Sequence, residues 1–277
     1  MSRLLADIGT VFRRELVTVR RTPGYAVLAA GLLVVLGGLV TVGGGGGTGF
    51  VPAVVELLLP TEILVPLLAI VLGYRALLTD AASGEFAVIR TYPVSTVGYV
   101  LGVLLARTVA LVAIVGLPFA LVGLYVWLTA APDTGIFATH SGGDSPLLFV
   151  RFLAFVLLFG TAYLSPSAAV SALASSRRSA IALGLLALLA GVLGGDLAVL
   201  RSLAGSMSPD SIAGSLALTP NGAFRGLVLE HVIGVAFTPD GIRSNRSRGR
   251  LTRRLDPRRD RGRCRDAHVR RSGRRRR

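Results

Sequence analysis

Five long apolar runs fill most of the first 200 residues of this chain, and arginines fall on alternate connections between them. A helix needs about 20 mostly apolar residues to cross the hydrocarbon core of a bilayer. The pattern therefore predicts an all-α integral membrane protein with five transmembrane helices. The runs are residues 25–42, 63–78, 97–131, 147–174 and 180–200. A mean hydropathy of +0.66 with 52% hydrophobic residues excludes an ordinary soluble core.

Two runs depart from the usual length. The second is short, and residues 51–59 are expected to lead into it from the interface. The third has 35 residues and contains Pro118, which predicts a steeply tilted or broken helix. Pro66 and Pro166 predict kinks in the second and fourth helices. The glycine run at residues 43–47 is interpreted as a flexible linker.

The arginines give the chain an orientation. Cytoplasmic loops carry more Arg and Lys than outer loops, so arginine-bearing segments are assigned to the cytoplasm. This predicts a multi-pass protein of the cell membrane with a cytoplasmic amino terminus. The arginines concerned are Arg13, Arg14, Arg20 and Arg21 before the first run, Arg75 and Arg90 after the second, and Arg177 and Arg178 after the fourth.

Residues 1–24 predict an amphipathic helix at the cytoplasmic membrane surface. Its apolar residues recur at steps of three and four and form one stripe, while Asp7, Glu15 and most arginines lie largely off it. Arg13, Arg14, Arg20 and Arg21 are expected to face anionic lipid. A soluble amphipathic helix is the alternative. The stripe consists of Leu4, Leu5, Ile8, Val11, Phe12, Leu16 and Val19.

The permease domain is expected to span residues 25–237, followed by an arginine-rich disordered tail at 238–277. Residues 240–277 hold 17 arginines and four acidic residues, so the tail carries most of the net charge of +15. The apolar stretch 223–237 resembles an interfacial or re-entrant element, and a sixth span is missing. Three explanations compete. The stretch enters the membrane and returns to the same side, or it crosses the membrane, or the tail is read out of frame from GC-rich DNA. The third is the preferred interpretation.

The cytoplasmic connection at residues 80–95 is the most specific segment. A Ser-Gly break, a short apolar stretch and a Tyr-Pro-Val-Ser exit predict a brief surface helix held between two spans. Such a helix can act as a mechanical lever on both spans. Its candidate residues are Ser83, Gly84, Glu85, Phe86, Arg90, Tyr92 and Pro93.

This connection resembles the coupling helix of type-2 ABC exporter permeases, and further stretches extend the resemblance over about residues 5–235. Residues 194–197 and 218–225 are similar to the NosY-like branch, which serves nitrous-oxide reductase maturation. The resemblance implies a dimer with a second permease copy or paralogue. It also implies a separate ABC ATPase subunit that binds ATP and Mg, with the coupling helix seated in a cleft of that subunit. The other matching stretches are residues 12–16, 20–22 and 168–180.

The chain offers no chemistry of its own. It has no phosphate-binding loop and no lysine, so ATP hydrolysis is assigned to the partner. His140, His231 and Met207 are scattered, and the single cysteine, Cys264, lies in the tail. We therefore expect no catalytic residue, no metal site, no bound cofactor and no specific nucleic-acid partner.

Charged residues near the spans have two interpretations. They guide a polar cargo, or they form structural pairs and reach to the interface, which is the favoured interpretation. The charged residues are Glu56, Glu62, Arg107, Arg151 and Asp196.

A membrane scaffold without transport is the rival function of the chain, and a secondary transporter is a third possibility.

Overall fold

Helices account for every regular element that this computed structural model describes. The described residues are 2–74, 95–130, 144–173, 176–204 and 219–237. Within these ranges there is no strand, so the predicted all-α fold is confirmed. The helices belong to one compact unit, Met1–Ala236, and of the second unit, Phe237–Arg277, only Phe237 is described. The predicted tail lies outside the described residues.

Four helices in the described ranges are long and apolar enough to cross a bilayer, which confirms a multi-pass membrane architecture. The fifth predicted run falls in α9 (Arg177–Ala204), where Ile181–Gly191 is the apolar stretch among the described residues. The four long helices are α2 (Pro23–Val42), α4 (Phe50–Gly73), α7 (Thr96–Thr129) and α8 (Pro146–Leu173).

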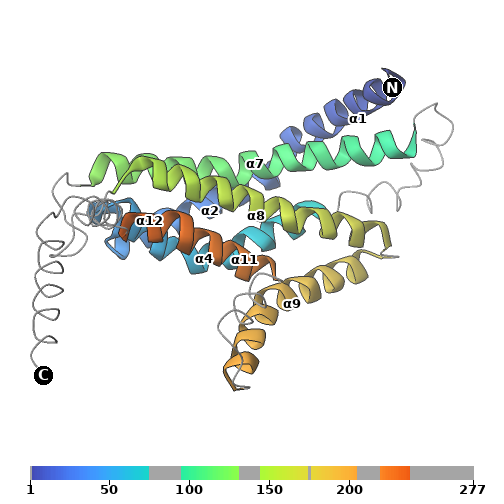
Figure 1. The fold of residues 1–277 in the computed structure, drawn as a ribbon. Helices are drawn as coiled ribbons and strands as arrows, with labels where there is room; N and C mark the ends of the chain where they lie inside the picture. The colour runs from blue at the N-terminus through green and yellow to red at the C-terminus, as the bar shows by residue number, and fades with distance from the viewer. Residues whose placement is uncertain (1, 75–94, 131–143, 174–175, 205–218, 238–277) are drawn as a thin grey trace, which may run out of the picture. The chain divides into compact units, whose positions relative to one another are not determined.

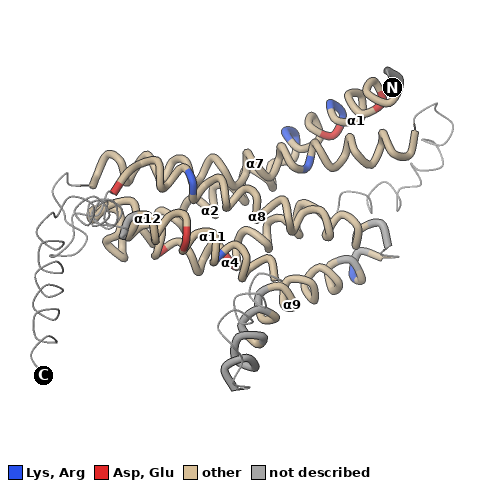
Figure 2. Tube along the Cα trace, in the orientation of Figure 1, with Lys and Arg blue, Asp and Glu red and all other residues tan. Residues whose placement is uncertain are grey.

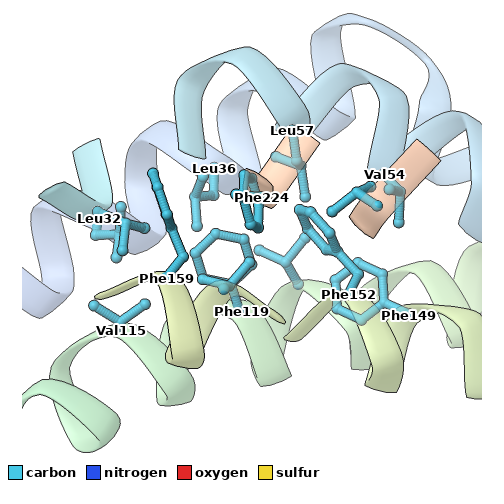
Figure 3. Packing of buried hydrophobic residues seen from close by; sticks show 14 of the residues in the cluster. Leu32, Leu36, Val54, Leu57, Val115, Phe119, Phe149, Phe152, Phe159 and Phe224 are labelled. Carbon is cyan, nitrogen blue, oxygen red and sulfur yellow. The ribbon is translucent and has the colours of Figure 1, made fainter. Parts of the chain in front are cut away.

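The centre of the bundle is formed where α8 packs along α4 and α7, with α2 against α4 and α7 (Figure 1). Phenylalanines from α7, α8 and a later helix meet there (Figure 3). The ring centroids of Phe119 and Phe152 are 5.9 Å apart, and those of Phe149 and Phe152 are 6.0 Å apart, both pairs edge-on. Lipid tails are as apolar as these side chains, so close packing rather than transfer from water holds the helices together.

The second crossing includes its predicted lead-in. Residues 51–59, expected to lead into the second run from the interface, and that run from Ile63 form the single helix α4, with Pro60 and Pro66 inside it. Neighbouring helices and local adjustments can accommodate the carbonyls that each proline leaves without a donor. The predicted continuation of this run, residues 75–78, lies outside the described residues. Glu62 consequently sits near the middle of α4.

The third crossing is one helix of 34 residues with Pro118 inside, and no break divides it in the described residues. At 1.5 Å per residue, α7 is about 51 Å long, well beyond the roughly 30 Å of a hydrocarbon core. The extra turns of α7 are not left bare, because α1 (Ser2–Arg21) covers its first turns (Figure 1). Of the two predicted alternatives, the broken helix is wrong, and the steep tilt stays a prediction.

The glycine run is also more ordered than a linker. It contains the short helix α3 (Gly45–Thr48), in which Gly45 and Gly46 are buried. The hydroxyl of Thr129 donates to the carbonyl of Gly46 at 3.0 Å. A Cβ atom at Gly46 would lie 2.9 Å from a ring carbon of Tyr125, so the absence of a side chain permits this close approach.

After α9, the described chain resumes in a helical run made of α11 (Pro220–Val228), a π-helical turn η1 (Leu229–Ile233) and α12 (Gly234–Phe237). It packs antiparallel to α8. Phe224 stacks on Phe159 with centroids 4.4 Å apart, and His231 meets Phe155 at 6.0 Å. The run starts beside α8 near Tyr163. Its position relative to a membrane, interfacial or re-entrant, stays a prediction.

Replacing Phe152 by Ala tests the packed centre. Phe152 is fully buried among three other rings, so the variant should lose roughly 1–3 kcal/mol of unfolding free energy. Leu128→Ala, at a side chain that is 71% exposed, is the control and should change stability little. Unfolding by SDS in mixed micelles measures both. Equal losses in the two variants would contradict this core.

Candidate functional site

The predicted coupling residues, Ser83 to Pro93, lie outside the described residues, but both flanking helices are described. Before the connection, α4 ends at Gly73; after it, Ser95 caps α7. The hydroxyl of Ser95 accepts a hydrogen bond from the backbone N–H of Gly98 at 3.2 Å. A serine here satisfies one of the N–H groups that a helix start leaves without a partner. The connection at residues 80–95 thus ends at the capped first turn of α7.

The same serine joins α7 to α1. The backbone N–H and the hydroxyl of Ser95 both donate to Oδ2 of Asp7, each at 3.1 Å. Asp7 and Ser95 are 88 residues apart in the chain. A carboxylate that accepts at the start of a helix also complements the positive end of the helix dipole. The end of the connection at residues 80–95 is therefore held to the amino-terminal helix.

Along the next turns, α1 and α7 run in the same direction and approach closely. A Cβ atom at Gly102 would lie 2.7 Å from Cβ of Val11 and 3.0 Å from the carbonyl oxygen of Ile8. At Gly98, a Cβ atom would lie 2.9 Å from Cβ of Asp7. Glycines spaced four residues apart let two helix backbones come together in this way. Val11 of the predicted apolar stripe thus packs on α7, whereas Leu5 of the same stripe is exposed.

One turn further, Arg107 of α7 ties three helices together. Its Nη2 donates to Oε2 of Glu15 at 2.9 Å, and its Nη1 donates to the hydroxyl of Tyr25, on α2, at 2.7 Å. The Arg107 and Glu15 side chains are only 7% and 6% exposed. The sequence placed Glu15 largely off the packed stripe of the first helix, and that was wrong, because Glu15 faces α7 and neutralises a buried arginine there.

A second ion pair, between the buried Glu62 and the 35% exposed Arg225, fastens α11 to the centre of the bundle. Arg225 donates from Nε to Oε1 of Glu62 at 2.8 Å and from Nη2 to its other carboxylate oxygen. Asn221 donates to the backbone carbonyl of Glu62 at 3.2 Å and accepts from the hydroxyl of Tyr163. Charges buried in apolar surroundings are tolerated when paired and hydrogen-bonded in this way.

The remaining predicted charges have separate surroundings. Glu56 accepts from the backbone N–H of Gly45 at 3.1 Å, and its Oε2 has no hydrogen-bond partner in the ranges the structure describes. Arg151 is exposed on α8. Asp196 lies in α9, and its side chain is outside the description. The structure therefore brings Glu62 and Arg107 into ion pairs and does not gather the four charges whose side chains it describes into one site; a cargo pathway stays a prediction.

The four arginines expected at the membrane surface are all exposed on α1 (Figure 2). Sequence reasoning named Glu62 and Arg107 as candidates for structural pairs but missed other residues that hold the helices together. For Ser95 and Thr219 a signal existed, because a serine or threonine before an apolar helix is a typical cap. For Asp144 there was no such signal in the sequence. Its carboxylate accepts hydrogen bonds from the backbone N–H groups of Phe50 and Val51 and so caps the start of α4, although Asp144 is more than 90 residues away in the sequence.

Comparison with known proteins adds no identity, since neither a protein-family model nor a curated protein matches this chain.

Gly102→Ala tests the close approach of α1 and α7. Alanine normally favours a helix interior over glycine by about 0.5–1 kcal/mol, but here the new methyl group meets Val11 and a backbone oxygen. We expect a net loss of about 1–3 kcal/mol of unfolding free energy. Gly116→Ala in the same helix is the matched control, because its nearest contact would be an ordinary 3.6 Å, and it should be neutral or stabilising. Stabilisation by both substitutions would refute the packing.

The Arg107–Glu15 pair is tested by a double-mutant cycle. Glu15→Leu and Arg107→Leu each leave one buried charge without its partner, which should cost about 3 kcal/mol per variant. The double variant removes both charges and should cost at least 2 kcal/mol less than the sum, by the order of magnitude typical of such pairs. SDS unfolding of the four proteins measures the coupling. Additive losses would show that the two charges do not interact.

Proposed function

We propose that this chain is the membrane-spanning permease subunit of an ABC exporter. It works as a dimer in the cell membrane with its amino terminus in the cytoplasm. A separate ATPase subunit binds ATP and Mg and supplies the energy. The resemblance of residues 80–95 to a coupling helix motivates the proposal, and the arrangement of the helices around that connection supports it.

The observation that carries the proposal is the attachment of the coupling connection to α7. The connection ends at Ser95, which caps α7 and is bound by Asp7 of α1. A push on the connection therefore moves the first turn of a helix rather than a loose loop. Because α7 is continuous over 34 residues, it carries this displacement along its length to Phe119 and Val126 in the core.

The charges around this junction agree with a cytoplasmic location. Arg13 and Arg14 are exposed on α1, which runs beside the first turns of α7, and Arg20 and Arg21 precede α2. The positive-inside bias assigns this end of the bundle to the cytoplasm, where an ATPase would meet it. Differential binding of the connection to two ATPase states then supplies the energetic link to the helices.

In this mechanism, closure of the ATPase dimer on ATP shifts the connection, and α4 and α7 move at its two ends. The α1–α7 contacts make the second of these ends the stiffer one. The α4 end has Gly73 packed against Ser167 of α8, so its motion is passed to α8. Access to the interface between two permease copies changes as these helices shift.

The proposal predicts the behaviour of a loop variant. The full chain, purified from its native membranes with associated subunits, should carry ATP turnover that it cannot produce alone. Glu85→Gln with Arg90→Gln should lower this turnover by about tenfold, the factor that corresponds to 1.4 kcal/mol of lost contact. Glu230→Gln with Arg277→Gln removes the same two kinds of charge elsewhere and is the control.

Two results would refute the proposal. If no ATPase subunit is recovered with the parental chain, the scaffold or the secondary transporter fits better. If the loop variant and its control keep equal turnover, residues 83–93 do not couple to a motor.

A further inference from the structure

A groove lies between the end of α4 and the start of α9. Helix α9 turns back after α8, which runs parallel to α4, so α4 and α9 are antiparallel (Figure 1). They meet where a Cβ atom at Gly184 would lie 2.7 Å from Cγ2 of Ile70. Beside this contact is a cavity of about 220 Å³, called here the α4–α9 groove. It is lined by Leu67, Ile70, Val71 and Tyr74 of α4 and by Ile181, Leu185 and Leu188 of α9.

The groove has a buried floor and an exposed rim. Ile70 and Leu188 form the floor and are only 7% and 8% exposed. The rim consists of Leu67, Ile181 and Leu185, which are between 40% and 50% exposed. Because α4 is long and apolar enough to cross a bilayer, its exposed side faces lipid. An apolar cavity does not hold water, since water needs polar partners, so the groove calls for an apolar occupant.

The dimensions of the groove limit what can enter it. From Ile181 to Leu188, α9 rises by about 10 Å. A cavity of about 220 Å³ over that length has a cross-section of roughly 20 Å², or about 5 Å in each direction. A helix with its side chains is about 10–12 Å wide. The groove therefore admits one extended hydrocarbon chain and is too narrow for a helix.

A positive charge lies at one end of the groove. Arg178, Ile181 and Leu185 recur at steps of three and four, so they lie on the same side of α9. Arg178 is exposed and precedes Ile181 by about one turn. Since the helices are antiparallel, Tyr74 at the end of α4 lies at this same end of the groove. An apolar slot with a guanidinium group at its end fits an amphiphile with a hydrocarbon chain and an anionic headgroup.

Two simpler explanations each cover part of this arrangement. An arginine near the end of a membrane helix can extend to the interface without a specific partner, but this gives no account of the cavity beside Arg178. A helix of a second copy could cover the rim, but it is too wide to reach the floor at Ile70 and Leu188. A lipid accounts for the floor, the rim and the charge together.

We infer that the α4–α9 groove binds an anionic phospholipid, with one acyl chain along Ile70 and Leu188 and the phosphate group at Arg178. Guanidinium groups form forked hydrogen bonds with phosphate oxygens. The acyl chain supplies the dispersion contacts that the lining side chains otherwise lack. This inference goes beyond the proposed transport function and does not depend on it, because it requires only that the bundle lies in a membrane.

Photo-cross-linking to a lipid tests the inference. The full chain is reconstituted in vesicles of phosphatidylcholine and phosphatidylglycerol. A trace of either lipid carries a diazirine near the middle of one acyl chain, and mass spectrometry locates the label after illumination. Residues 67–74 should be labelled about fivefold more by the phosphatidylglycerol probe than by the phosphatidylcholine probe, the factor expected from the attraction of one arginine to an anionic lipid. Residues 121–128 of α7, whose leucines are also exposed, should show no such preference.

Two pairs of variants separate the groove from the general lipid surface. Leu185→Trp fills the groove and should reduce labelling of residues 67–74 at least threefold, whereas Leu183→Trp, at an exposed position of α9 outside the lining, should not. Arg178→Gln should bring the two probes to equality at residues 67–74. Arg13→Gln removes one exposed arginine from α1 and should leave the preference intact.

Any of three results overturns the inference. Residues 67–74 take up neither probe, which would mean that another segment or a second copy fills the groove. Leu185→Trp leaves their labelling unchanged. Arg178→Gln keeps the preference for phosphatidylglycerol, or Arg13→Gln loses it as fully, which would mean that no headgroup is bound at Arg178.

Discussion

A buried arginine on a membrane helix governs how helices α1, α2 and α7 of this protein assemble. Arg107 sits in α7 with only 7% of its side chain exposed, where a lone guanidinium charge would be costly. The carboxylate of Glu15 and the hydroxyl of Tyr25 compensate that cost. Because these partners lie on α1 and α2, the stability of Arg107 requires both helices to stand beside α7. The amino-terminal helix is thereby part of the bundle and not a separate anchor.

The same principle operates at a second place with different consequences. Arg225 and Glu62 join α11 to α4, and Asn221 links this pair to Tyr163 on α8. Around these polar contacts, the helix surfaces are aliphatic and aromatic. Contacts between such surfaces have little directional preference. Hydrogen-bonded pairs fix the register that apolar packing leaves open. The two ion pairs therefore connect different sets of helices: α1 with α7, and α11 with α4 and, through Asn221, with α8.

The sequence was a good guide to the helices and a poor guide to their contacts. Apolar length predicted α2, α7 and α8 to within a few residues, since crossing a bilayer is a property of the run itself. For α4, Glu56, Pro60 and Glu62 interrupt the apolar pattern, and only the neighbouring helices make one continuous helix favourable. The partner of Arg107 is 92 residues away, and the charge pattern of α1 alone pointed Glu15 elsewhere. Pairings of this kind depend on the assembled bundle and leave no local signature.

The docking of α1 along the first turns of α7 is the central claim, and disulfide trapping in membranes measures it most directly. In a Cys264→Ser background, Val11→Cys is combined with Gly102→Cys, whose Cβ position lies 2.7 Å from that of Val11, so a slight adjustment gives disulfide geometry. Val11→Cys with Gly116→Cys, about 21 Å further along α7, is the control pair. The account predicts that mild oxidation protects both thiols of the first pair, and neither of the second, from a mass-adding maleimide. Unprotected thiols at 11 and 102 would contradict it.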